Sequence, residues 1–567
     1  MSVGSLLNQF DDGLSSLLGQ WNGYSTAIVT ALVLILTYSM MNRVESEVHP
    51  MLLARQAAHE GIRNEGETPV YRTQIPGYSL FTGLDLKDPG ASPFSAGRDG
   101  DLRDIWRRVI SGSQKKDATG AKGRILTVLG SAKVVEHNLN DITRQINLIG
   151  QHIASQHGSK VAIYLPNSVE FIATLFACSF YNLTAILLPF DQPEDVIISM
   201  LQRSGADTVV TAPGAFPFDN AVKSYPALRQ LIWVVDDGNK HLDWNEVPKG
   251  IGGSVNVSTW QDIINDSPQD AGVELPEVDP KSKIQDVIIF WQSKPGTLEE
   301  MVQFTQGNLV SAIYAQTQAI KPPHDFSPAD LFLPSASLSS SFPLVLTLAA
   351  LFSNASVAFN SVAGTTPDLA LATAGVAPTI VVATPQTLAQ THAETTGKIT
   401  SLLARASHWV STRSLVQNGA MPAASFLASY NDSLRPQIGT PAPGKLRLLY
   451  VAEPVGAGAP RLSEQMLSDL RIYTGARVIY ALSAPPVAGA VTQTAFYDYR
   501  VGGDGTGVHF GPPVGSTEVY LVNSGGHKIT DDNYTGEIVV RGPAVAGGKA
   551  ALGAIGTIRV DNTLAYA

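Results

Sequence analysis

Between residues 160 and 235, short apolar runs alternate with stretches that are predicted to be helical. The runs hold four to six residues, and most of them end near a proline or a polar turn. Strands of this kind, buried on both faces and separated by helices, are typical of a parallel sheet covered by helices on both sides. The predicted strands are Lys160–Leu165, Thr184–Leu188, Asp207–Thr211 and Leu231–Val235, with helices over Glu170–Asn182 and Pro193–Arg203.

The same pattern resumes further on and then changes. Apolar strands are predicted at Val287–Phe290, Thr379–Val382 and Leu446–Val451, whereas Glu518–Val522 and Glu537–Arg541 are short alternating strands between glycine-rich turns. We therefore predict an α/β protein with two doubly covered α/β subdomains and a small β subdomain. Their expected bounds are 120–283, 284–494 and 495–567. Residues 43–119, rich in turn formers, are predicted to be an arm that packs on this body or links it to a membrane.

The N-terminal region has its own pattern. No charged residue lies between Asp12 and Arg43, and the stretch 24–42 is mostly apolar. A transmembrane helix over 24–42 is the favoured interpretation, because a cleaved signal peptide would need basic residues before it. The basic residues all follow the stretch, which predicts that the body faces the cytosol and that the tail 1–23 does not. The endoplasmic reticulum is the default membrane, with the mitochondrial outer membrane, peroxisome and lipid droplet as alternatives.

Charge and cysteine content narrow the classes of function. Only 16% of residues are charged, and 39 basic residues against 49 acidic ones leave a net charge of −10. An acidic chain of this kind is not a nucleic-acid binder. The single cysteine, Cys178, excludes an intramolecular disulfide and a zinc site with several cysteines. No metal site is predicted.

Several segments, in the same order along the chain, resemble the adenylate-forming superfamily, and long-chain fatty acyl-CoA synthetases most of all. The similar stretches are residues 160–211, LFLP at 331–334, PTIVVATP at 378–385, GAGAPRLS at 456–463 and the segment 511–543. The resemblance implies the N-terminal fold of that superfamily and a ligase that joins fatty acids to coenzyme A with ATP. It also implies nucleotide-binding residues at Ser293, Gly458, Ala459, Pro460, Tyr480 and Ser483, where the tyrosine stacks on adenine.

The residues that perform the superfamily's chemistry differ in this chain. Glu299 and Glu300 stand where the phosphate loop has proline and lysine, and two carboxylates there repel a triphosphate. Ala484 replaces the glutamate that holds Mg²⁺, and Ser337 replaces the histidine beside the reacting carboxylate. The superfamily's aspartate for the ribose is not found after Pro543. Its mobile C-terminal domain, with the catalytic lysine, is also expected to be absent.

Three functions remain open on this basis. The favoured one is a catalytically impaired protein, tied to a membrane, that serves lipid metabolism as a ligand-binding or scaffold protein. Its ligand would be a nucleotide or a fatty acyl group, with ATP or AMP as the only cofactor that the resemblance allows, and a protein partner is compatible with it. The alternatives are an active fatty acid–CoA ligase completed by a partner, and a purely structural tether.

Overall fold

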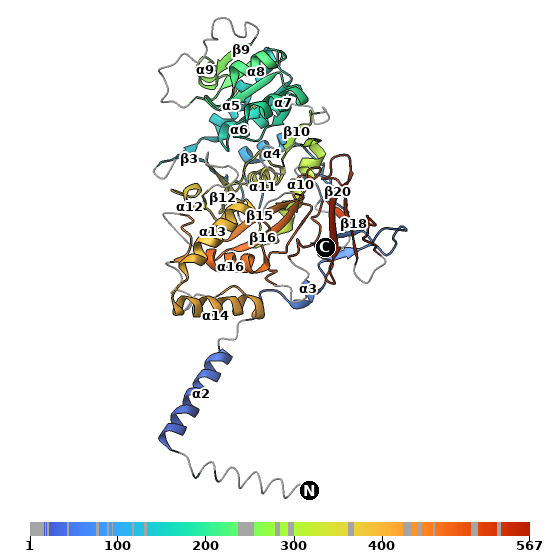
Figure 1. Cartoon of the computed structure of the whole chain (residues 1–567). Helices are drawn as coiled ribbons and strands as arrows, with labels where there is room; N and C mark the ends of the chain where they lie inside the picture. The colour runs from blue at the N-terminus through green and yellow to red at the C-terminus, as the bar shows by residue number, and fades with distance from the viewer. Residues whose placement is uncertain are drawn as a thin grey trace.

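A computed structural model gives the arrangement of the chain (Figure 1). It describes residues 22–567 except 42–44, 75–78, 88–89, 93–94, 116–117, 130–132, 236–254, 278–283, 293–299, 361–367, 423–433, 440–444, 457–459, 501–507 and 530–533, and also Ser16 and Gly19. Three sheets and the helices that cover them form the body, and helix α2 (Gly23–Met41) extends away from it.

The first sheet has the strand order β11-β10-β6-β5-β7-β8-β9 and is parallel except for β11. The runs predicted between residues 160 and 235 are all confirmed as strands in it. Serine and glycine set the ends of its helices: the Ser168 hydroxyl accepts from the Phe171 N–H at the start of α6, and Gly205 ends α7 in the left-handed conformation. The elements are β5 Lys160–Tyr164, β6 Thr184–Leu187, β7 Thr208–Thr211, β8 Gln230–Trp233, β9 Asn256–Thr259, β10 Val287–Trp291 and β11 Glu300–Phe304, with α5 Leu139–Ser155, α6 Val169–Phe180, α7 Glu194–Ser204, α8 Phe218–Ser224, α9 Trp260–Asn265 and α10 Gln306–Ala319.

The second sheet has the order β17-β16-β15-β14-β12-β13-β3-β4. Its central strands are parallel and almost wholly buried, which explains their continuous apolar sequence. Strands β3 and β4 precede every strand of the first sheet in the sequence, but they belong to the second sheet. The chain therefore passes from the second sheet to the first and back again. The elements are β3 Ile125–Leu129, β4 Lys133–His137, β12 Leu331–Pro334, β13 Ser356–Asn360, β14 Ile380–Ala383, β15 Leu448–Pro454, β16 Arg477–Ser483 and β17 Thr492–Gln493, with α11 Ser341–Phe352, α12 Leu369–Ala372, α13 Pro385–Lys398, α14 Leu402–Asn418 and α16 Glu464–Thr474.

The third sheet joins the two ends of the chain. Its order is β1-β2-β18-β19-β20-β21, and all its pairs are antiparallel. Two strands of the predicted arm therefore extend the predicted β subdomain, and the arm also contains helices that the turn-rich sequence did not predict. The elements are β1 Ala57–His59, β2 Tyr71–Thr73, β18 Glu518–Val522, β19 Thr535–Arg541, β20 Lys549–Ile558 and β21 Leu564–Tyr566, with the arm helices α3 Pro50–Ala54 and α4 Leu102–Ser111.

Helix α2 corrects one prediction. Among the described residues, none of the helices has both the length and the apolar character that crossing a membrane requires. The transmembrane helix predicted over 24–42 is therefore not supported. The apolar centre of α2, Ala27–Leu36, is interrupted by Thr30 and is short beside the roughly 20 residues that a bilayer needs, and Ser25 and Thr26 precede it.

Candidate functional site

The carboxyl end of β16, beside that of β15, holds two of the predicted nucleotide residues, Tyr480 and Ser483. These strands are parallel neighbours, with Val451 opposite Tyr480 and Pro454 opposite Ser483. In open α/β sheets, ligands bind beyond the carboxyl ends of the strands, and the loop that contains Pro460 starts at this edge. This edge is therefore the candidate site.

The Tyr480 ring is enclosed by aromatic side chains of the chain itself. It stacks on Phe510 with ring centroids 5.2 Å apart, and Tyr566 of β21 meets Phe510 edge-on at 5.0 Å. Only 1% of Tyr480 is exposed to solvent. Since a stacking platform needs an open ring face, Tyr480 in this conformation cannot receive an adenine.

The Tyr480 hydroxyl is also used internally. It donates a hydrogen bond to Oε2 of Glu453, which lies near the end of β15 and is 4% exposed. Burial raises the pKa of Glu453, although the bond from Tyr480 and the nearby Arg461, with its Nε 3.5 Å from Oε1, act in the opposite direction. Sequence reasoning missed Glu453. A single carboxylate inside the buried run LLYVAEP was the signal that could have revealed it.

The other predicted residues are placed as follows. Pro460 is exposed, whereas Ser483 is buried and its hydroxyl donates to the Glu453 carbonyl at 3.4 Å. Ser293, Gly458 and Ala459 lie outside the described residues.

The structure describes two of the positions at which the sequence differs from the superfamily's motifs, Ala484 and Ser337. Ala484 is fully buried and offers no oxygen to a metal. The Ser337 hydroxyl makes a 2.9 Å hydrogen bond to that of Ser339. The described residues around this edge therefore do not fit Mg·ATP.

Helix α10, which follows the segment compared with the phosphate loop, connects two parts of the body. Thr305 and Asn308 form a capping box at the start of α10. The Asn308 side-chain amide also donates to the carbonyls of Pro543 and Val545, at 2.7 and 3.1 Å. This contact fastens the third sheet to the rest of the body.

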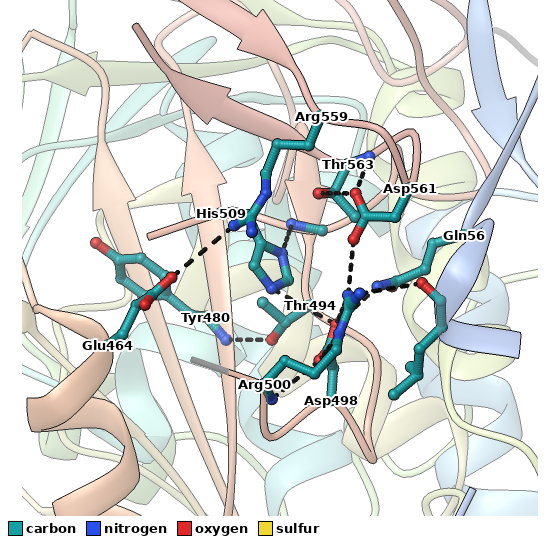
Figure 2. A network of polar contacts seen from close by, with 12 residues as sticks. Gln56, Glu464, Tyr480, Thr494, Asp498, Arg500, His509, Arg559, Asp561 and Thr563 are labelled. Atoms are coloured by element: carbon teal, nitrogen blue, oxygen red, sulfur yellow. Dashed lines mark hydrogen bonds and ion pairs between the residues drawn. The ribbon is translucent and has the colours of Figure 1, made fainter. Parts of the chain in front are cut away.

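A buried polar network lies next to Tyr480 (Figure 2). Its centre is Asp498, whose fully buried carboxylate accepts two hydrogen bonds from Arg500, at 2.8 and 2.6 Å, and one from Gln56 at 2.7 Å. The N–H of Gly511 donates to Nδ1 of His509, so Nε2 carries the ring proton and faces Asp498 at 3.5 Å. Burial would raise the pKa of Asp498, but Arg500 above all holds it at about 2.

Asp561 belongs to the same network. Its carboxylate lies 2.8 Å from the Arg500 guanidinium and accepts a 2.7 Å hydrogen bond from the Thr563 hydroxyl. These contacts occupy the only acidic side chain that follows β20 (Figure 2). Asp561 is therefore a structural residue that links the C-terminal strand to Gln56 and Asp498.

A second cluster joins His392 and His408 to Asp469, which lies 77 and 61 residues further along the chain. Nε2 of His392 and Nε2 of His408 lie 3.0 and 2.9 Å from the two carboxylate oxygens of Asp469, and the Tyr473 ring packs on both imidazoles. Burial would raise the pKa of Asp469, but the hydrogen bonds from His408 and His392 hold it below its usual value. Because both nitrogens face the carboxylate, the cluster is a hydrogen-bonded joint between α13, α14 and α16.

A family model described as AMP-binding enzyme matches residues 135–548, well over half of the chain. The chain belongs to the AMP-binding enzyme family. The predicted superfamily and its α/β fold are thereby confirmed. No curated protein matches the chain by sequence.

Solved structures of this family share the fold. The long-chain-fatty-acid-CoA ligase FadD1 from Archaeoglobus fulgidus has a TM-score of 0.56 and 14% identity, with 85% of this chain and 86% of that chain covered. The N-terminal domain of FACL13 from Mycobacterium tuberculosis has a TM-score of 0.55 and 13% identity, covering 82% and 99%. The anthranilate CoA ligase AuaEII bound to anthranoyl-AMP has the same TM-score and identity, covering 82% and 76%. At these identities the likeness shows the fold alone.

The buried Asp498 carboxylate is expected to carry a large share of stability. Asp498→Asn should lower the free energy of unfolding by about 3 kcal/mol, because Arg500 then loses a buried charge partner. The effect should be present above about pH 4, the ordinary pKa of an aspartate, and fade as the pH falls through 4 toward about 2. Urea unfolding of wild type and variant between about pH 6 and about pH 3 measures it. The exposed Asp270→Asn serves as the control; an Asp498→Asn effect as small as the control's would contradict the assignment.

The Tyr480 hydroxyl can be tested in the same way. Tyr480→Phe should destabilise the protein by about 1–3 kcal/mol, because the buried Glu453 carboxylate loses a hydrogen-bond donor. Tyr497→Phe is a matched control, since the Tyr497 hydroxyl has no hydrogen-bond partner in the part of the chain that the structure describes; its effect should stay within about 0.5 kcal/mol. Equal urea midpoints for the two variants would show that the Glu453 bond contributes nothing.

Proposed function

We propose that this member of the AMP-binding family does not form acyl adenylates, and that it serves lipid metabolism as a binding or scaffold protein. One observation carries the proposal. Tyr480, the aromatic platform of the nucleotide site, is 1% exposed and stacks on Phe510 instead of presenting a free face. A nucleotide could stack there only after the aromatic side chains had been displaced.

The chemistry of neighbouring positions supports the same proposal. Transition-state stabilisation in acyl adenylation is electrostatic, and it depends on groups aimed at phosphate and carboxylate oxygens. At the matching positions this chain has Ala484, Ser337 and Glu300, none of which carries positive charge, and Ala484 has no oxygen for Mg²⁺. Glu300 lies in strand β11 and is exposed. Several losses together oppose catalysis more strongly than any one of them.

The region of this chain that corresponds to the family's substrate tunnel is densely packed. Helix α11, which follows the strand that precedes the family's substrate tunnel, has every residue buried. Its leucines and Val345 pack into the main hydrophobic core with β12 and β13. A core role is sufficient to explain the apolar sequence of α11. The link to lipid metabolism rests on the fold shared with a long-chain-fatty-acid-CoA ligase.

Ligand binding to the purified full-length chain tests the proposal. Mg·ATP, and then a non-hydrolysable fatty acyl-adenylate analogue, should leave the melting temperature unchanged and give no heat in calorimetric titration. Binding at 100 times the Kd would stabilise the fold by about 2.7 kcal/mol, which thermal unfolding detects easily. FadD1 from Archaeoglobus fulgidus serves as the fold-matched comparison protein.

A single substitution should not restore activity. Ala484→Glu replaces one missing carboxylate, but the platform stays closed and the other groups stay absent. We expect no acyl adenylate by mass spectrometry after incubation with ATP, Mg²⁺ and a long-chain fatty acid. Adenylate formation by this variant, or tight ATP binding by the wild type, would instead support the active-ligase alternative.

A further inference from the structure

Exposed apolar side chains gather at one end of the molecule. Of the 22 large apolar side chains that are exposed in the described part of the chain, 14 lie on α2, α3 and α14. Helices α3 and α14 both lie at the end of the body from which α2 extends (Figure 1). Clusters of this kind mark interaction surfaces. The 14 residues are Tyr24, Ile28, Val29, Leu32, Val33, Leu34, Leu36, Met51, Leu52, Leu402, Leu403, Trp409, Val410 and Val416.

Helix α14 turns its bulky residues away from the body. The side that packs on the body has Ala404, Ser407, Ser411 and Leu415, of which three are small. The opposite side carries Leu402 and Trp409, which are 82% and 61% exposed. An ordinary surface helix has the reverse arrangement, with its large apolar residues facing the core. Packing within the chain therefore does not account for the outward face of α14.

The charge on α14 indicates what covers this face. The helix has no acidic residue, although the whole chain has a net charge of −10. Arg405 and Arg413 are both exposed, and the Arg413 guanidinium lies over the Trp409 ring, 5.6 Å from its centroid. Tryptophan and arginine beside exposed leucines are typical of helices that lie in the interface of an anionic bilayer.

Contacts in the arm hold the other apolar elements at the same end. The Glu47 N–H donates to the Gly419 carbonyl, just after α14, and the Glu47 carboxylate pairs with Arg477 and accepts from the Tyr499 hydroxyl. Helix α2 ends at Met41, six residues before Glu47, so its end lies within about 22 Å of the end of α14. The last turn of α2 and the whole of α3 are thus near the end of α14, and the remaining turns of α2 extend away from the body (Figure 1).

We propose that the face formed by α14 and α3 docks on the surface of an anionic phospholipid membrane. Leu402, Trp409 and Met51 enter the interface, and Arg405 and Arg413 contact the lipid phosphates. A hollow of about 430 Å³ beside Trp409, lined by Arg405, His408 and Tyr473 among others, lies at the level of the headgroups. The proposal is independent of nucleotide binding and requires no helix to cross the bilayer.

Quenching of Trp409 fluorescence by lipid tests the insertion step. The full-length chain is mixed with vesicles of equal parts phosphatidylcholine and phosphatidylserine whose acyl chains carry bromine, and Trp409→Phe is measured alongside it. Wild type should be quenched more than Trp409→Phe, because it has one more tryptophan in the interface. Equal quenching of the two proteins would overturn the proposal, even if α2 alone holds the protein on the vesicles.

Vesicle flotation tests the electrostatic part. Arg405→Gln combined with Arg413→Gln should weaken binding to phosphatidylserine vesicles by about 30-fold in total, because each arginine lost near the surface weakens binding by less than about tenfold. Binding to pure phosphatidylcholine should not change. Val560→Ser, at a fully exposed apolar position far from α14 in sequence, controls for general surface hydrophobicity. Far-UV circular dichroism and melting temperature confirm that each variant is folded.

The competing occupant of the face is a second copy of the chain. Sedimentation velocity without lipid distinguishes the two. A dimer that Trp409→Phe or the double arginine variant dissociates, together with unchanged flotation of these variants, would overturn the membrane assignment. A monomer with phosphatidylserine-dependent flotation that the arginine variant loses supports it.

Discussion

The burial of one carboxylate, that of Asp498, holds the two ends of this protein together. A fully buried charge is tolerated only when it is paired and hydrogen-bonded. The Asp498 carboxylate pairs with Arg500, accepts a hydrogen bond from Gln56 and faces the His509 ring. Gln56 comes from the N-terminal arm, and Arg500 also binds Asp561 before the last strand. The arm, the second sheet and the third sheet are therefore fixed by a single network.

The same packing closes the nucleotide edge. Phe510 follows His509 directly, so the network that positions the imidazole also positions the ring that covers Tyr480. Tyr566, two residues after the last core leucine of β21, completes the aromatic group. Tyr480 and Phe510 at this edge are part of the buried core. Its residues contribute to stability, and Glu453 illustrates this, since its buried carboxylate is satisfied by the tyrosine hydroxyl.

The hydrophobic pattern predicted the strands correctly where both faces of the sheet are buried. Strands such as Lys160–Tyr164 and Val287–Trp291 appear where continuous apolar runs predicted them, because a parallel sheet covered on both faces requires such runs. The arm was harder to predict. The sequence of α4 has a charged face, and its role depends on Trp106, which packs between distant segments of the first core. Short-range pattern contains no information about such partners.

The resemblance grouped Tyr480 and Ser483 as nucleotide-binding residues, but it did not indicate their surroundings. The parallel pairing of β15 with β16 places them at the carboxyl edge of the sheet. The clusters around Asp469 and Asp498 could not be predicted, because each unites residues that are dozens to hundreds of positions apart.

By itself, the sequence determined the family and the α/β class, since these depend on local pattern and residue identity. The tertiary structure decided that Phe510 closes the adenine face of Tyr480 and that α14 points its tryptophan outward. Both facts concern which surface a side chain buries. That choice is set by packing between segments distant in the chain, which no local pattern encodes.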